Sequence, residues 1–234
     1  ALLAASLAPE PAHAKKWTFD SGTPFGFGLV AGLAQNPDTS LVGGQGASTP
    51  SASSSFSHFV GFEPFLDFGN FAVKASGQLV SYPVFTATGT DGVGAYSETS
   101  DVGALALGAS LILAPYISQN KTARGYMRLG VALARSRGEN VRSYPSVAYT
   151  EKFEGDFREL SLGAGLEFFL AQNYSMHIEA GFRQMEVERF TYRSGTDRQG
   201  NAKNAGDPLL NTDGTNRKMN HSGAYGSLGL NLHF

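Results

Sequence analysis

Two short runs of the sequence hold side chains of the kind that act in catalysis or metal binding. His221 directly precedes Ser222, and a histidine beside a serine is the pairing that activates a nucleophile in hydrolases. Adjacent residues of a strand point to opposite faces of a sheet, so these two side chains would not meet on a strand. We interpret them as polar residues near a strand end, and the sequence predicts no catalytic residue.

His177 and Glu179 stand two positions apart, which places them on one face if the segment is a strand. An imidazole and a carboxylate at this spacing can approach one metal ion, but the sequence identifies no further ligands. The acidic residues in Asp91-Gly92 and Asp213-Gly214 lack the alternating ligands of a calcium loop and are typical of turns. We therefore expect neither a metal nor a cofactor, and we assign His177 and Glu179 to a hydrogen-bond network.

Composition excludes several other classes of function. The 234 residues include no cysteine and carry a formal net charge of -2, which argues against nucleic-acid binding, disulfides and thiol chemistry. Glycine and phenylalanine are frequent, at 29 and 17 residues, and this combination favours strands over helical bundles. The apolar runs are too short for a membrane-spanning helix.

The elements that would position these side chains are strands, because apolar residues recur at every second position in eight segments. The expected strands cover residues 25–33, 56–66, 71–82, 103–113, 126–134, 159–168, 174–191 and 221–234.

The connectors between these segments alternate between long and short. Residues 35–55, 83–102, 135–158 and 192–220 form long connectors, and residues 67–70, 115–123 and 170–173 form short ones. This alternation is typical of a membrane barrel with long loops at one end and short turns at the other. The sequence therefore predicts an all-β, eight-stranded, antiparallel up-and-down transmembrane barrel.

Charged side chains occupy one face of the predicted strands. A lysine or arginine facing lipid near the bilayer midplane costs about 2–4 kcal/mol, so the charged face must line the lumen. The lumenal polar set comprises Glu63, Lys74, Arg128, Glu159, Glu167, His177, Glu179 and Arg183. An eight-stranded lumen is narrow enough for side chains to fill, so we expect these opposite charges to form a plug.

The chain ends on alternating apolar residues, Leu228, Leu230 and Leu232, followed by the terminal Phe234. This ending resembles the assembly signal of bacterial outer-membrane β-barrels, and the architecture is similar to the OmpA transmembrane-domain and OmpX-like barrels. The resemblance implies a Gram-negative outer-membrane location with periplasmic termini. It also implies contact with outer-membrane lipid, lipopolysaccharide and the barrel-insertion machinery as partners.

Residues 1–14 end in Ala12-His13-Ala14, which fits the small-x-small rule of a signal-peptide cleavage site. We therefore expect a residual signal peptide at 1–14 and one barrel domain at 15–234.

The leading functional hypothesis is a non-enzymatic barrel that supports envelope structure or surface interaction through its long loops. A narrow channel for small or hydrophobic solutes is the alternative, because lumenal glycines leave room, and a lipid-modifying enzyme is a third.

Aromatic residues of the loops, such as Tyr96 and Phe153, either anchor a partner or pack into a cap. The surface ligand and the oligomeric state are not specified, and extra hairpins at 86–100 or 141–153 would raise the strand count to ten.

Overall fold

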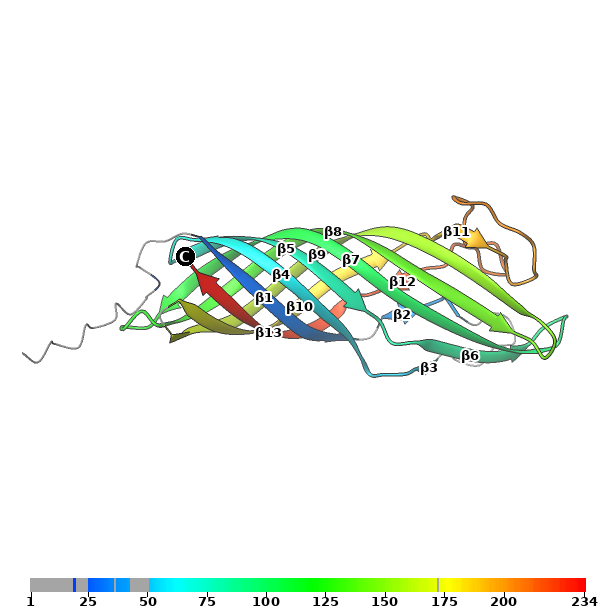
Figure 1. The fold of residues 1–234 in the computed structure, drawn as a ribbon, viewed down its shortest axis with the longest axis horizontal. Helices are drawn as coiled ribbons and strands as arrows, with labels where there is room; N and C mark the ends of the chain where they lie inside the picture. Colours follow the sequence, from blue (N-terminus) through cyan, green and yellow to red (C-terminus); the bar gives the residue numbers. More distant parts are fainter. Residues whose placement is uncertain (1–18, 20–24, 36, 43–50, 172) are drawn as a thin grey trace, which may run out of the picture.

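The computed structural model describes Phe19 and residues 25–35, 37–42, 51–171 and 173–234 (Figure 1). The predicted signal peptide at 1–14 lies outside these residues. Eight antiparallel strands form a closed ring, because the last of them, β13, pairs with both β10 and β1. In ring order they are β1 (Phe25–Gln35), β4 (Phe56–Asp67), β5 (Phe71–Ser81), β7 (Ala95–Ile117), β8 (Ala123–Ser143), β9 (Ala148–Ala171), β10 (Tyr174–Val187) and β13 (Gly223–His233). The eight-stranded up-and-down barrel predicted from the sequence is confirmed.

No helix in the described part of the chain is long and apolar enough to cross a membrane.

The barrel has two different ends. The C-terminus and the three short turns lie at one end, which we call the terminal end, and the long connectors lie at the other, the loop end (Figure 1). The turn between β4 and β5 places Gly69 at a φ of 82°, in the left-handed region that a residue without Cβ adopts easily.

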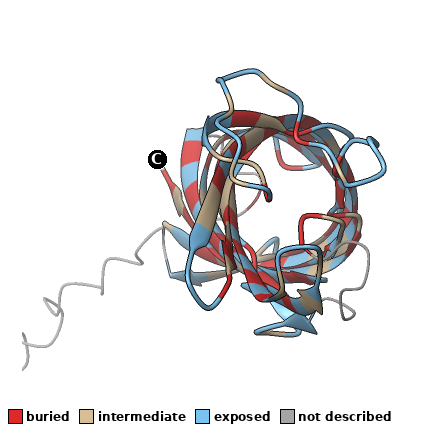
Figure 2. Cartoon of the chain, turned by 90° about the vertical axis from the view of Figure 1, so that its right-hand side faces the viewer, coloured by how far each residue is buried: buried red, intermediate tan, exposed pale blue. Residues whose placement is uncertain are grey.

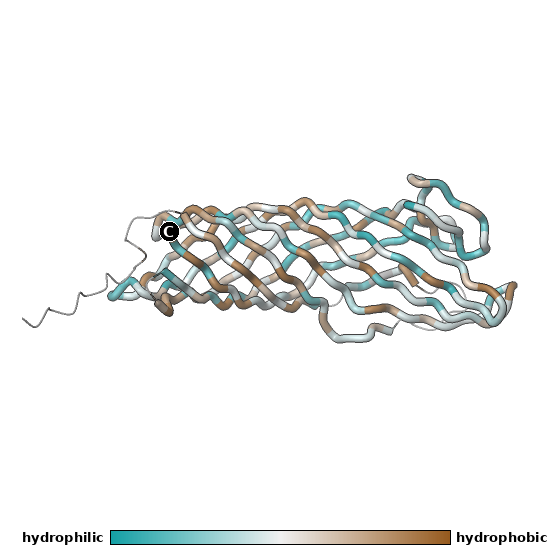
Figure 3. Tube along the Cα trace, in the orientation of Figure 1, coloured by the Kyte–Doolittle hydropathy of each residue, from teal (hydrophilic) through white to brown (hydrophobic). Residues whose placement is uncertain are grey.

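An apolar belt surrounds the half of the barrel near the terminal end (Figure 3). Large apolar side chains on all eight strands point outward and are exposed, including Leu29, Leu107, Leu129, Leu166 and Ile178. Charged side chains of the same strands point inward and are buried. This arrangement is inverted relative to a soluble barrel and is the one that a bilayer requires.

Three strands extend well past this belt, and here the predicted connectors need correction. β7, β8 and β9 continue as a paired wall through residues 95–102, 135–143 and 148–158, which the sequence assigned to long loops. Outward positions of this wall are mostly polar or charged, and inward positions are buried. The colours that alternate along the strands in Figure 2 show this change of burial from residue to residue. The wall continues above the belt with the same side-chain alternation, but its outer face is polar where that of the belt is apolar.

Short strands complete the loop end. β6 (Phe85–Thr90) forms a hairpin with β7 and also pairs with β3 (Ser51–Ala52). β11 (Thr191–Gly195) pairs with β9, and β12 (Met219–Asn220) joins β10 to β2 (Asp38–Thr39). The hairpin expected near 86–100 therefore exists, while residues 141–153 prolong β8 and β9, and the ring keeps eight strands.

Candidate functional site: the barrel interior and the loop end

Four of the eight predicted lumenal residues lie in one polar network. Glu63 on β4 is fully buried; the Lys74 Nζ lies 3.1 Å from its Oε2, and the Arg128 Nη2 lies 2.8 Å from its Oε1. Arg128 also reaches the Glu179 Oε1 at 3.7 Å, and Glu179 accepts hydrogen bonds from Tyr126 and Tyr225. Opposite charges from four strands thus meet in the middle of the barrel.

Glu167, another predicted residue, belongs to a second group near the terminal end. Its Oε2 lies 2.6 Å from the Arg124 Nη2, and the same nitrogen lies 2.8 Å from Asp67. Its Oε1 accepts hydrogen bonds from Ser175 and Asn231. Arg124 and Asp67 were not predicted from the sequence, because both stand at strand ends in or beside short connectors, although their parity matches that of the lumenal set.

His177 is buried between these two groups, with its Nδ1 3.3 Å from the Asn231 Nδ2. Among the described residues, no group of three or more histidine, aspartate and glutamate side chains could hold a metal ion.

Glu159 and Arg183 remain without a direct ion pair among the described residues. Arg183 is buried with its guanidinium 5.6 Å from the centre of the Phe59 ring, and its Nε and Nη2 have no hydrogen-bond partner. Both residues line a cavity of about 20 Å³ beside Arg128 and Glu179, and a second cavity of about 10 Å³ lies next to it. Spaces of this size hold about one water molecule.

The candidate catalytic pair does not assemble. The Ser222 Oγ accepts from the Met185 backbone N–H at 3.0 Å and donates to the Met185 carbonyl at 3.2 Å. The His221 ring is buried and stacks on Tyr82, with ring centroids 4.4 Å apart. The two side chains thus have different partners, the Met185 backbone for Ser222 and the Tyr82 ring for His221.

A second serine and histidine do meet, at the terminal end. The Ser175 Oγ lies 2.8 Å from the His233 Nε2. Glu167 lies 3.9 Å from that same ring nitrogen, whereas a triad acid binds the other one, and Ser175 is fully buried. These contacts have the geometry of a structural network rather than of an accessible nucleophile.

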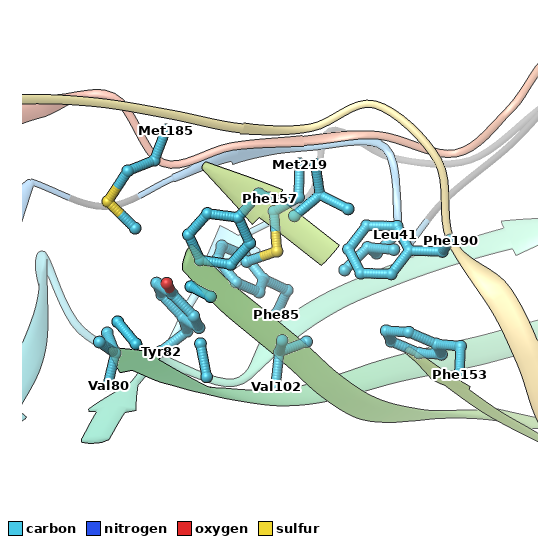
Figure 4. Packing of buried hydrophobic residues seen from close by; sticks show 14 of the residues in the cluster. Leu41, Val80, Tyr82, Phe85, Val102, Phe153, Phe157, Met185, Phe190 and Met219 are labelled. Carbon is cyan, nitrogen blue, oxygen red and sulfur yellow. The ribbon is translucent and has the colours of Figure 1, made fainter. Parts of the chain in front are cut away.

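An apolar cluster fills the lumen toward the loop end (Figure 4), and it includes loop aromatics for which packing into a cap was one of two expectations. We call it the inner apolar cluster. Its members include Leu41, Val80, Tyr82, Phe85, Val102, Phe153, Phe157, Met185, Phe190 and Met219. The loop aromatics therefore pack inward: Phe153 and Phe190 are fully buried, with ring centroids 5.2 Å apart in an edge contact.

Ion pairs tie the long connector after β11 to the barrel wall. The Arg198 Nε donates to Glu98 on β7 at 2.9 Å, and Arg217 binds Glu151 on β9 through both terminal nitrogens, at 2.5 and 3.0 Å. Burial opposes ionisation of Glu151, but the charge and hydrogen bonds of Arg217 outweigh it and hold the pKa of this carboxyl below its ordinary value. These two bonds hold the connector against the barrel wall. Each joins residues far apart in the sequence, with a separation of 100 residues for Arg198 and Glu98 and of 66 residues for Arg217 and Glu151.

A cavity of about 690 Å³ opens at the loop end above these pairs. Its lining includes Tyr96, Tyr192, Arg142, Arg198 and Arg217. Nearby, Asp91 accepts a hydrogen bond from the Tyr144 hydroxyl at 2.6 Å. Burial opposes ionisation of Asp91, but this bond, two backbone N–H groups and Arg142 lower its pKa.

The four residues of the predicted assembly signal lie on the outer face of the last strand. Leu228, Leu230 and Phe234 are exposed and Leu232 is half-buried. The Phe234 ring stacks on Phe25 of β1, with centroids 5.7 Å apart, across the seam that closes the barrel.

Comparisons with known proteins find similarity in solved structures. No protein-family model and no curated protein sequence matches the chain. Neisserial surface protein A matches with 13% identity and a TM-score of 0.45 over 90% of this chain and 97% of its own. A major outer membrane protein from Thermus thermophilus matches with 11% identity and a TM-score of 0.48 over 90% and 99%. The outer membrane protease OmpT from Escherichia coli matches with 9% identity and a TM-score of 0.40 over 94% and 100%.

These likenesses concern the course of the backbone, and one fold of this kind hosts many functions. The closed ring of eight antiparallel strands, apolar outside and charged inside, is the architecture of a small bacterial outer-membrane β-barrel.

Proposed function

We propose that the protein is a non-enzymatic, non-conducting barrel of the bacterial outer membrane that presents its loop end to the outside of the cell. In this orientation the termini are periplasmic, and the protein contributes to envelope structure or to surface contact. The observation that carries the proposal is the filled interior: a salt-bridged polar network occupies the belt, and the inner apolar cluster closes the lumen beyond it. The two cavities beside the polar network are each of about the size of one water molecule.

The lumenal glycines support this view rather than a channel. A Cβ added at Gly163 would lie 2.5 Å from the Tyr225 hydroxyl, and one at Gly165 would lie 2.5 Å from the Tyr126 ring. At Gly28 it would lie 2.5 Å from the Asn231 side-chain oxygen. Neighbouring side chains thus take up the space that these glycines leave.

The loop end has the features of a surface that keeps its shape. Buried ion pairs fix the connector after β11, and the inner apolar cluster supports the wall from below. The loop-end cavity is therefore preorganised for contact with a partner, and preorganised surfaces lose less entropy on binding. The C-terminal residues Leu228, Leu230, Leu232 and Phe234 would be read by the insertion machinery before the seam closes.

Planar-bilayer recording of the refolded protein tests this function. We expect no steady conductance from the native chain. A variant with Arg128→Ala and Arg183→Ala also stays closed, because the inner apolar cluster remains, but it unfolds at lower temperature. The matched control, Arg189→Ala with Arg193→Ala, removes the same charge from exposed positions and leaves both properties unchanged. Steady small conductance from the native protein would contradict the proposal and favour the channel.

A further inference from the structure

The outer wall carries a groove at the upper edge of the apolar belt. It has a volume of about 860 Å³ and lies across β5, β7, β8 and β9. Its lower part is apolar, with the exposed leucines Leu79, Leu105, Leu107 and Leu133. Its upper part is charged, with three arginines, Arg135, Arg137 and Arg158, against one carboxylate, Asp156.

Strand register brings the two halves into direct contact. Leu105 faces Arg135 across the β7–β8 pair, and Leu133 faces Arg158 across the β8–β9 pair. The apolar and basic parts therefore adjoin each other within one row of side chains.

Glycine forms part of the groove. Gly103 occupies an outward position on β7 opposite Arg137, and the next outward residues on the same strand are Asp101 and Leu105. A Cβ at Gly103 would meet only the Val80 carbonyl, at 3.4 Å, so a side chain is sterically acceptable there. Its absence leaves the groove open between the leucines and the arginines.

The three arginines differ in whether a neighbouring carboxylate already pairs with them. Arg135 forms an ion pair with Asp156, with 2.6 Å between its Nε and the Oδ1, and Arg137 forms one with Glu154, with 3.3 Å between its Nε and the Oε2. Arg158 is exposed and has no ion-pair partner among the described residues. Its guanidinium is free to bind a phosphate through two parallel N–H donors.

From this charge complementarity we propose that the groove binds a phosphorylated lipid of the surrounding leaflet, with the phosphate on Arg158 and its neighbours and the acyl chains along the leucines. The site is independent of whether the lumen conducts. It would hold one such lipid against the barrel as the rest of the bilayer exchanges.

Native mass spectrometry of the detergent-solubilised protein, with bis-phosphorylated lipid A or phosphatidylcholine added, tests the proposal. We expect the native chain to retain lipid A in preference to phosphatidylcholine. Arg158→Gln should weaken this retention about fivefold, because one interfacial arginine contributes about 1 kcal/mol to the binding of anionic lipid. Gly103→Val should weaken it as well without any change of charge, by filling the groove.

Two controls keep the test independent of folding. Lys218→Gln removes one exposed charge at the loop end away from the groove, and Gly125→Val adds a side chain to the outer wall near the terminal end, where its Cβ would meet atoms at ordinary distances of 3.7 Å or more. Both should retain lipid A like the native chain. Equal retention by all four variants overturns the proposal, as does equal retention of phosphatidylcholine. Displacement of lipid A by excess inorganic phosphate would assign the groove to a free anion instead of a lipid.

Discussion

The wall within the belt and the wall above it are built from the same strands but have outer faces of opposite polarity. On β9, the outward residues Leu160, Leu162 and Leu166 are exposed and apolar. Closer to the loop end, the outward residues of the same strand are charged, as at Lys152, Asp156 and Arg158.

The inward face changes from mainly polar to mixed, because apolar rings join buried ion pairs such as that of Glu151 above the belt. Glu167 lies inside the belt, whereas Phe157 and Phe153 lie inside the wall above it. β10 shows the same change, from Arg183 to Met185 and Val187. The alternation of side chains is a property of the strand, while the polarity of the outer face is set by the solvent that it meets.

The largest expected effect comes from the interior above the belt. Phe153→Ala should lower the free energy of unfolding by about 3–5 kcal/mol, because the rigid cluster leaves a cavity. Phe182→Ala on the lipid face should cost about 1.5–3 kcal/mol, since lipid chains close around the smaller side chain and only the transfer term is lost. Urea unfolding in lipid vesicles measures both; equal costs would mean that the inner apolar cluster is loosely packed.

A charge placed on the outer wall distinguishes the two regions next. Leu166→Arg in the belt should destabilise the barrel by about 2–4 kcal/mol. Thr99→Arg, on the outward face of β7 above the belt, should change stability by no more than about 0.5 kcal/mol. The same unfolding measurement applies, and a large cost at Thr99 would place that part of the wall in lipid.

Low pH should loosen the loop end. The pKa of Glu151 is lower in the folded protein than in the unfolded chain, so its stabilising contribution is complete above the ordinary carboxyl pKa and is lost as pH falls through the folded value. The pKa of Asp91 changes in the same direction. Protease cleavage in the connector after β11 should therefore increase as pH falls below about 4. Glu151→Gln should already show rapid cleavage at neutral pH, and a pH-independent cleavage rate in the native protein would argue against this anchoring role.

The smallest effect belongs to the exposed ion pairs of the outer wall. The Arg135 and Asp156 side chains are about half and two-thirds exposed, at 49% and 68%, although they lie 2.6 Å apart. Asp156→Asn should cost less than about 1 kcal/mol. Unfolding at low and high salt checks this, since a cost that persists in high salt would indicate more than a screened surface pair.

Sequence alone was sufficient for the belt and insufficient for the loop end. Charges such as Glu63 and Arg128 identify the lumen because lipid excludes them from the other face. The wall at 135–143 and 148–158 was read as loop, because its outward positions, including Arg135 and Lys152, are charged and broke the expected apolar face. A search for alternation of any polarity, with no requirement that one face be apolar, would have predicted these strand extensions.

The anchoring of the long connector had no local signal. Arg198 and Arg217 bind Glu98 and Glu151 across large separations in sequence, and only the closed ring brings those strands beneath the connector. Leu41 and Val42 likewise enter the inner apolar cluster from a short segment after β1. Such contacts depend on the tertiary fold and not on spacing.

The outer face of β9 changes from polar to apolar along the strand, and a spin-label scan of β9 tests this directly. The chain has no cysteine, so each single cysteine introduced at positions 152–168 carries a unique label. In vesicles, we predict that labels at 160, 162, 166 and 168 collide with oxygen dissolved in lipid, that labels at 152, 154, 156 and 158 collide with a water-soluble nickel complex, and that labels at 153 and 157 are shielded from both. Lipid access at 152–158, or nickel access at 153 and 157, would contradict the account.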